Sequence, residues 1–372
     1  MTGVLMEELV EEVLLRFPPD DPASLVRAAL VSKPWCRLIA GRGFRRRFRE
    51  LHLHRAAAPM LGFICNVLGA ASARLVPTLT TSCLPRADHH GWRALDSRDG
   101  LVLLCNANCS DIVEMEPFDP FVVWNPITGE HLQLPYLPLE RCAPPGPFFF
   151  NATVLCAGAG SDDDACDHLD GSGHGGRFLV VFVGTYADGL FTYVYSSESG
   201  AWSEPSSMAD HPHDMLDSVP AAMVGTAVHF MFKCSMRMLK FDLATRENSV
   251  QGKLGFTRAE DYKLYLWSSM EVVGGHGGVE WTRDRVIELN SLLPADALLT
   301  PPDVVGCVHG CGVVLVGTGD GFFRIDLKLN QADDDVDTGY GHCFFIVVPY
   351  TGFYFPGTYN LAYLFILPVF RI

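Results

Sequence analysis

The sequence predicts an α+β chain of two domains, a small N-terminal three-helix domain followed by a mainly-β, propeller-like domain. Apolar residues near the N-terminus recur at helical spacing, whereas the later sequence alternates short β-rich runs with turn residues. Hydrophobic residues make up 48% of the 372 and charged residues 19%, which is enough apolar surface for a large core. We expect a helical domain at residues 1–50, a connecting segment at 51–90 and a β-rich domain at 91–372.

The first helix is predicted from apolar residues that recur every four positions. Glutamates lie mostly on the opposite side of this helix, and Pro18 and Pro19 end it. The residues of its apolar face are Leu5, Leu9, Val10, Val13, Leu14 and Phe17.

Two more helices are predicted between residues 21 and 43. Asp21 before Pro22 is a helix start, because a carboxylate accepts bonds from the first backbone N–H groups and proline is tolerated there. Ser32 is expected to cap the third helix, with Pro34 in its tolerant first turn. At about forty residues the unit is near the lower size limit for independent folding, so it needs a neighbouring domain or a partner. The apolar residues of the two helices are Leu25, Val26, Ala29 and Leu30, then Trp35, Leu38 and Ile39, before Gly41 and Gly43 end the third.

Residues 5–44 resemble an F-box, the module that docks substrate receptors onto SCF-type ubiquitin ligases. The matching residues are Leu5, Leu9, Val13, Leu14, Arg16, Pro18, Leu25, Arg27, Val31, Ser32, Lys33, Trp35, Leu38 and Ile39. Two positions depart from the family pattern: Met6, where proline usually follows leucine, and Pro34 before the tryptophan. The resemblance implies that the adaptor is bound by Leu5, Leu9, Val13, Leu14, Pro18, Leu25, Val31, Lys33, Trp35, Leu38 and Ile39.

Two downstream segments, Trp92–Leu104 and Val123–Gly129, resemble plant F-box proteins, especially those of grasses. This resemblance implies a divergent β-propeller-like domain behind the F-box.

The β-rich part of the chain repeats a strand, a turn of Thr, Ser, Asn or Gly residues, and a second strand. Repeated strand pairs are typical of propeller blades, although neither Trp-Asp nor kelch double-glycine signatures recur. A β-sandwich with an additional sheet is the alternative. The repeats are Phe121–Gly129, Tyr193–Trp202, Leu239–Asn248 and Phe323–Asn330, with Gly278–Leu289 as a further unit.

The formal net charge of -15 argues against general nucleic-acid binding, which needs a positive surface. One basic cluster runs against this balance, and we interpret it as a solvated helix face, with a nuclear-import signal as the alternative. Its residues are Arg42, Arg45, Arg46, Arg47 and Arg49.

The N-terminus lacks the pattern of a secretory signal, so we expect the 12 cysteines to be reduced thiols in the cytoplasm and/or the nucleus. The glycosylation sequons at Asn108 and Asn151 then carry no meaning. The apolar segment Cys343–Ile372 is divided by three prolines into pieces shorter than a membrane span. We expect closing strands or a buried tail there, and no membrane partner.

No motif for catalysis or for a cofactor is found, since nucleophile-elbow, phosphate-loop and zinc-protease signatures are all absent. Two groups have the side chains of a metal site, but each lacks a full ligand set, and we expect no metal. They are Cys307, His309 and Cys311, and His211, His213 and Asp214. The acidic runs Asp162–Asp164 and Asp333–Asp335 are expected to be exposed loop tips.

The sequence therefore predicts a non-catalytic substrate receptor. Its helical domain would bind the small SCF adaptor and, through it, the cullin scaffold, while the β-rich domain would hold a target protein that the sequence does not identify. Two alternatives remain open: an interaction scaffold with a degenerate F-box, and a propeller that binds or hydrolyses glycans.

Overall fold

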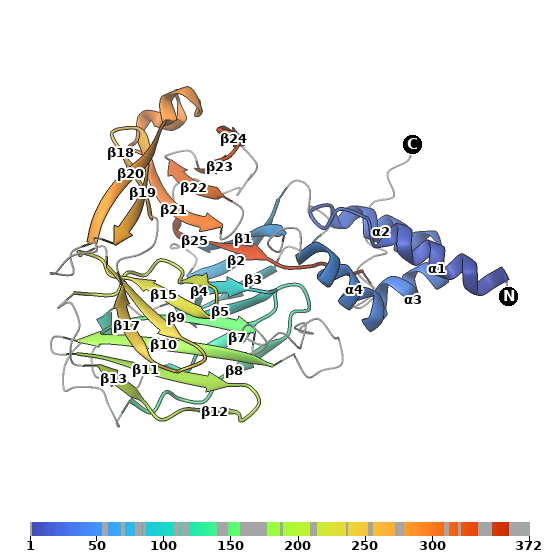
Figure 1. The fold of residues 1–372 in the computed structure, drawn as a ribbon, viewed down its shortest axis with the longest axis horizontal. Helices are drawn as coiled ribbons and strands as arrows, with labels where there is room; N and C mark the ends of the chain where they lie inside the picture. Colours follow the sequence, from blue (N-terminus) through green and yellow to red (C-terminus); the bar gives the residue numbers. More distant parts are fainter. Residues whose placement is uncertain are drawn as a thin grey trace.

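The structure is a computed structural model in which four helices lie at one end of a β-propeller (Figure 1). It describes residues 2–53, 59–67, 71–78, 84, 87–107, 112–113, 119–139, 148–156, 177–186, 189–208, 214–235, 237–251, 256–271, 279–308, 312–318, 321–333 and 344–356.

The helical domain has four helices where three were expected. Gly41 ends the third helix, and its N–H donates to Leu38 O at 3.0 Å. The chain turns helical again at once, so that Gly43 lies inside a fourth helix instead of ending the third. Phe44 and Phe48 explain this helix, because their spacing of four places both on one buried face. The helices are α1 (Thr2–Leu14), α2 (Pro22–Val31), α3 (Lys33–Ala40) and α4 (Arg42–Leu53).

The predicted helix caps are partly observed. Ser32 Oγ accepts a hydrogen bond from Trp35 N at 3.3 Å, and Pro34 sits in the first turn of α3 without breaking it. Asp21, by contrast, makes no capping bond to the backbone; its carboxylate accepts the hydroxyl of Ser24 at 2.5 Å.

The β-rich domain consists of six antiparallel sheets, numbered here in the order of the chain. Sheet 1 contains β25 (Phe344–Thr351), β1 (Met60–Val67), β2 (Ser72–Pro77) and β3 (Ala87–His90). Sheet 2 contains β4 (Trp92–Arg98), β5 (Leu101–Asn106), β7 (Val122–Trp124) and β8 (His131–Gln133). Sheet 3 contains β6 (Ile112–Val113), β9 (Phe148–Cys156), β10 (Phe178–Tyr186), β11 (Gly189–Ser196), β12 (Ala201–Trp202) and β13 (Ser206–Met208).

The remaining three sheets continue the series. Sheet 4 contains β14 (Ala222–Val224), β15 (Ala227–Met231), β16 (Met238–Asp242) and β17 (Asn248–Gln251). Sheet 5 contains β18 (Phe256–Glu260), β19 (Lys263–Glu271) and β20 (Val279–Glu288). Sheet 6 contains β21 (Asp303–Val308), β22 (Val313–Thr318), β23 (Gly321–Asp326) and β24 (Gln331–Asp333). Two short 3-10 helices, η3 (Leu289–Ser291) and η4 (Ala297–Leu299), lie between sheets 5 and 6 in the chain.

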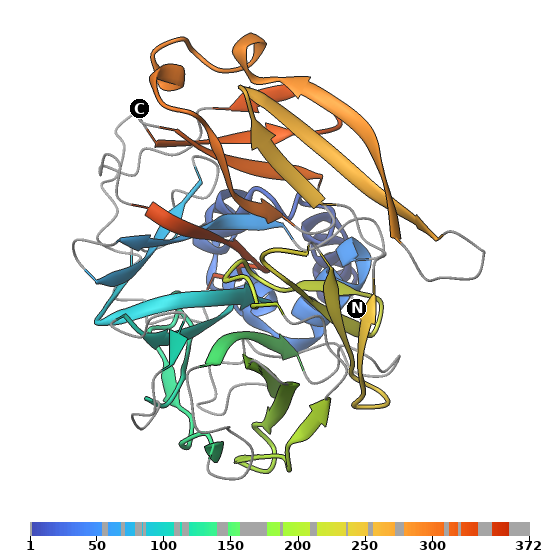
Figure 2. The same cartoon turned by 90° about the vertical axis from the view of Figure 1, so that its left-hand side faces the viewer.

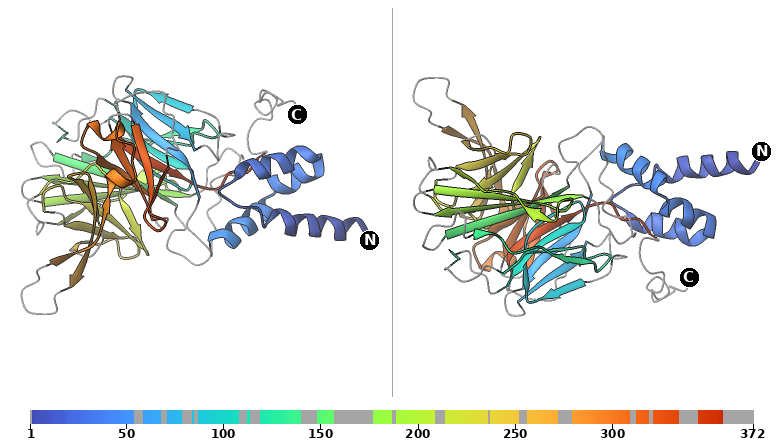
Figure 3. Two further views of the ribbon diagram at one scale, coloured as in Figure 1. Left: turned by 90° about the horizontal axis from the view of Figure 1, so that it is seen from above. Right: turned by 90° about the horizontal axis from the view of Figure 1, so that it is seen from below.

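The six sheets surround a common centre, as the view along the ring shows (Figure 2). Neighbouring sheets are joined by contacts between individual strands: β25 with β4, β4 with β9, β18 with β21, and β21 with β25. This arrangement confirms the propeller prediction, and the alternative of two packed sheets is not observed. Figure 3 shows from two further sides that the helices extend from one end of the ring.

The ring is closed by strands from opposite ends of the chain. β25 pairs antiparallel with β1, and Ile64 lies opposite Val348. The expected connecting segment at residues 51–90 therefore contains three strands of sheet 1, and the β-rich domain begins near Met60 rather than at residue 91. The sequence did not show this because the partner strand β25 lies almost three hundred residues away along the chain.

The repeated sequence motif forms the same turn in sheets 2, 3, 4 and 6, where it joins β7 to β8, β11 to β12, β16 to β17 and β23 to β24. In each turn a side-chain oxygen accepts the backbone N–H two residues later. The residue four positions later has a positive φ, between 55° and 75°, and donates its N–H to the first residue's carbonyl. The residue pairs are Asn125 and Gly129, Ser196 and Gly200, Asp242 and Arg246, and Asp326 and Asn330.

The further unit at Gly278–Leu289 departs from this pattern. It contains β20, the third strand of sheet 5, but the chain continues into η3 instead of a turn. Sheet 5 thus has three strands among the described residues.

Replacing Asn125 by Ala should lower the free energy of unfolding by about 1–2 kcal/mol. Asn125 is buried, and its Oδ1 accepts from Ile127 N at 3.0 Å and Thr128 N at 3.2 Å, so Ala leaves both donors without this acceptor. Urea unfolding measures the change. Asn125→Asp restores an acceptor and should recover most of the stability; equal stability of the Ala variant and wild type would contradict this role.

Apolar side chains fill the spaces between neighbouring sheets. The largest cluster of the described residues lies between sheets 2 and 3, and within it Phe150 and Phe182 of sheet 3 stack with ring centroids 5.7 Å apart. Similar clusters lie between sheets 1 and 2, 3 and 4, 1 and 6, and 5 and 6. These contacts hold the ring of sheets together.

A buried polar network crosses three sheets near the centre of the ring. Thr153 on β9 donates its hydroxyl to Asp96 Oδ2 on β4. Arg98 Nε lies 3.2 Å from the same oxygen, and Arg98 also donates to Ala221 O beside β14. Both the Asp96 and the Thr153 side chains are buried, so this ion pair is shielded from water.

Candidate docking surface on the helical domain

The predicted site residues divide into a buried and an exposed group. Leu14, Leu25 and Ile39 are at most 1% exposed and form the core of the helical domain with Phe44 and Phe48. Trp35 and Leu38 are half-buried against this core. These residues therefore hold the helices together, and the three buried ones cannot touch a partner directly.

Among the helical residues whose side chains the structure describes, four large apolar ones are exposed. Leu9 and Val13, four residues apart on one face of α1, are 66% and 57% exposed. Leu30 and Val31 in the last turn of α2 are 62% and 67% exposed. These four, which we call the apolar docking residues, are four of the ten large hydrophobic residues exposed in the described part of the chain.

Three other predicted site residues remain, namely Pro18, Lys33 and Leu5. Pro18, between α1 and α2, and Lys33, the first residue of α3, are both exposed. Leu5 lies in α1, as does Met6, but their side chains are outside the described part. Leu30 was predicted on the helix face but not in the site, and it is exposed like its neighbour Val31.

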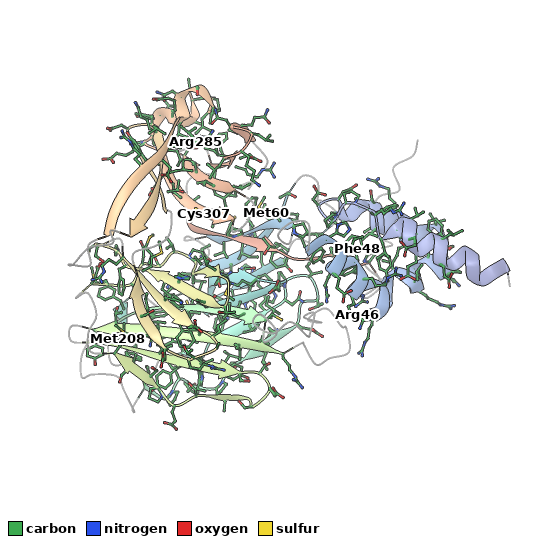
Figure 4. The ribbon with its side chains drawn as sticks, in the orientation of Figure 1. Arg46, Phe48, Met60, Met208, Arg285 and Cys307 are labelled. Carbon is green, nitrogen blue, oxygen red and sulfur yellow. The ribbon has the colours of Figure 1, made fainter. Side chains whose placement is uncertain are left out.

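The basic cluster of α4 is not a uniformly solvated face, contrary to expectation. Arg45 and Arg49 are 5% and 6% exposed, and their guanidinium groups lie 5.9 Å and 5.6 Å from the ring centroid of Phe355. Arg46 stays at the surface, near Glu50, whereas Phe48 points into the helical core (Figure 4).

Arg47 ties α4 to α1. Its guanidinium donates to Glu12 and, at 2.8 Å, to Glu11. The hydrogen bonds to these two carboxylates raise the pKa of Arg47, with Glu12 contributing most. The glutamates predicted on the polar side of the first helix thus fix that helix against the fourth.

Neither metal candidate is assembled in the described residues, among which no group of three metal-ligating side chains occurs. Cys307 lies on β21, but His309 and Cys311 are outside the described part, as are His211 and His213. Asp214 accepts backbone N–H groups of Met215, Cys234 and Ser235. These bonds lower the pKa of Asp214 against the raising effect of its burial, and they occupy its oxygens.

Five described cysteines are free thiols: Cys36, Cys65, Cys105, Cys234 and Cys307. Cys156, at the end of β9, is disulfide-bonded, which differs from the expectation of reduced thiols throughout. Burial raises the pKa of Cys65 strongly, so this thiol is unreactive.

Three other sequence features can be placed. The sequon residue Asn151 is 1% exposed and donates to Asp217 O and Val219 O, so its amide is inaccessible; Asn108 is outside the described part. Asp333 ends β24 instead of forming a loop tip, whereas residues 162–164 and 334–335 are outside the described part.

The described helices include none long and apolar enough to cross a membrane. Within Cys343–Ile372, residues 344–351 form the expected closing strand.

An aromatic cluster between sheets 1 and 2 surrounds His89. Its ring centroid lies 5.4 Å from that of Trp124, 5.8 Å from His131 and 5.9 Å from Trp92. Burial among these rings lowers the pKa of His89, and the charge of His131 lowers it further, against a smaller raising effect of the backbone hydrogen bond with His90.

The pKa of His89 predicts that stability falls with acidification. Because the folded state binds the proton more weakly, the unfolded state is protonated first as the pH drops below about 6.5. The free energy of unfolding should be lower at pH 5.5 than at pH 7.5, and His89→Gln should reduce that difference. Urea titrations followed by tryptophan fluorescence measure both. An identical pH dependence in the two proteins would show that His89 contributes nothing.

Comparison with known proteins identifies an F-box domain, whose family model matches residues 5–47. No curated protein matches the chain. Among solved structures, a chain of a nidogen/laminin complex is similar at a TM-score of 0.37 and 10% identity, over 78% of this chain and 97% of that one. A prolyl endopeptidase is similar at a TM-score of 0.30 and 10% identity, over 71% of this chain and 37% of that one. The WD40 domain of SCAP from fission yeast is similar at a TM-score of 0.21 and 10% identity, over 78% of this chain and 53% of that one.

Proposed function

We propose that this chain is the non-catalytic substrate receptor of an SCF-type E3 ubiquitin ligase. F-box domains in general bind the small SCF adaptor, and a domain of this family followed by a β-propeller fits such a receptor. In this proposal the helical domain binds the adaptor and, through it, the cullin scaffold. The propeller holds the protein to be ubiquitinated.

The observation that carries the proposal is the exposure of the apolar docking residues. Leu9, Val13, Leu30 and Val31 all lie inside the F-box match and are each more than half exposed. Large apolar side chains contribute most to binding where a partner excludes water from them. Exposed apolar surface of this kind, outside the core of the helical domain, is what an adaptor-binding module requires.

The receptor acts by tethering. A target held on the propeller is kept near the ubiquitin-carrying enzyme of the complex, so the encounter with a target lysine becomes effectively intramolecular. Catalysis then comes from other subunits, and the chain needs no cofactor or metal of its own.

Two further assignments belong to the same proposal. The segments Trp92–Leu104 and Val123–Gly129 support a place among plant F-box proteins of the grass type. A cytoplasmic and/or nuclear location follows from the ligase role. Neither the resemblance nor the location specifies the target protein.

Reconstitution tests the proposal directly. The purified full chain is mixed with the SCF adaptor and then with the cullin, and the complexes are separated by size-exclusion chromatography. A receptor elutes with both proteins, and the cullin joins only when the adaptor is present. If a folded wild-type chain elutes alone, the ligase role is wrong and the scaffold alternative gains support.

A further inference from the structure

The segment that follows β25 leaves the propeller and enters the helical domain. Phe353 and Phe355 are 7% and 0% exposed, and both belong to the apolar core formed by the helices. Tyr354, between them, instead joins the cluster of sheets 1 and 2, which also includes Val26 of α2. Consecutive residues of this segment thus pack into both domains.

The contacts with α4 are specific to aromatic side chains. The ring of Phe48 meets Phe353 and Phe355 edge-on, with centroids 6.1 Å and 5.7 Å apart. The guanidinium groups of Arg45 and Arg49 lie over the ring of Phe355. Leucine or alanine would not reproduce either contact.

The same segment is held by the closure of the ring. Gly352 N donates to Pro59 O at 3.0 Å, and Gly100 N donates to Thr351 O at 3.0 Å. Tyr350 donates its hydroxyl to Gly100 O at 3.2 Å. The position of the two phenylalanines therefore depends on β25 being paired in sheet 1.

We propose that the helical domain is not autonomous: Phe353 and Phe355 complete its core, so the docking surface forms only when β25 has closed the propeller. A chain with an unclosed ring lacks two phenylalanines of the helical core and holds α4 loosely. The loosening extends to α3, which packs against α4, and to α1, which Arg47 joins to α4. The inference rests on the proposed function for its meaning. This dependence of the helical core on β25 couples adaptor binding to the folding of the propeller, the domain that would carry the target.

The coupling is tested in the full chain with Phe355→Ala. Amide hydrogen exchange should show protection of α3 and α4 reduced by roughly tenfold or more, with the strands of sheets 3 and 4 unchanged. Adaptor affinity should fall by a similar factor. The milder Phe355→Leu should give a smaller loss in the same helices.

A matched control is Phe230→Ala, which removes a phenylalanine that is 0% exposed in sheet 4 and belongs to the cluster between sheets 3 and 4. This variant should lose protection in those sheets while the helices and the adaptor affinity stay at wild-type values.

The exchange measurement separates the two proposals. A wild-type chain that does not bind the adaptor overturns the proposed function, whereas the protection of α3 and α4 in Phe355→Ala can still be read without any adaptor. Unchanged protection of the helices, or an equal loss in helices and sheets for both Phe355 variants, overturns the coupling.

Discussion

The double substitution Leu9→Asp with Val13→Asp should weaken adaptor binding by roughly a hundredfold or more while leaving the chain folded. Both side chains are more than half exposed on one face of α1, so their loss removes little core packing. Burying two carboxylates in an apolar interface is strongly unfavourable, and each lost anchor alone corresponds to about tenfold in affinity or more. Isothermal titration of the full chain with the adaptor measures the change.

The matched control for this variant is Leu329→Asp with Leu299→Asp. These leucines are 67% and 83% exposed on the propeller side of the molecule. They have the same chemistry as the α1 pair but lie outside the F-box match. The control should bind the adaptor with wild-type affinity. If the α1 variant also binds with wild-type affinity, Leu9 and Val13 do not belong to the docking site.

Replacing Asp96 by Ala should lower the free energy of unfolding by about 3 kcal/mol. The substitution leaves Arg98, whose side chain is 16% exposed, without its carboxylate partner, and removes the carboxylate acceptor of the buried Thr153 hydroxyl. Removing one partner of a buried ion pair costs several kcal/mol because the other charge stays buried. The hydrogen bonds of Asp96, Arg98 and Thr153 join sheets 2, 3 and 4, so their loss weakens the ring. Denaturant unfolding measures the loss of stability.

Glu198→Ala serves as the control for Asp96→Ala. Glu198 pairs with Arg177 at 3.5 Å, but the two side chains are 64% and 72% exposed. Solvent screens such pairs, so stability should change by less than about 1 kcal/mol. If both variants lose the same amount, burial of the Asp96 network is not what stabilises the ring.

Local patterns in the sequence predicted the fold well where neighbours along the chain decide the structure. The turn motif around Asn125 and Asp242 depends on residues within five positions, so it could be found and counted. Helical spacing located α1 and α2 for the same reason. Gly43 misled because glycine ends helices often, while Phe44 and Phe48 continue the apolar face past it.

Long-range pairing could not be predicted in this way. Nothing near Met60 indicates that its strand pairs with β25, and this hid the true start of the propeller. The apolar C-terminal segment was expected to form closing strands or a buried tail, and only the structure shows that Phe353 and Phe355 lie inside the helical core.

The candidate site was predicted as a set of residues, not as a surface. Periodicity shows which residues share a helix face, but not whether that face meets the core or a partner. Leu14 and Leu25 turned inward, whereas Leu9 and Val31 face solvent. Leu30, omitted from the predicted site, could have been included because it precedes Val31 at the end of the same apolar helix.

Hydrogen exchange of the full chain with and without the adaptor tests the central claim most directly. The account predicts new protection at α1 and at the end of α2, around Leu9, Val13, Leu30 and Val31, with the propeller strands unchanged. Protection confined to the propeller, or none at saturating adaptor, would contradict docking through the helical domain.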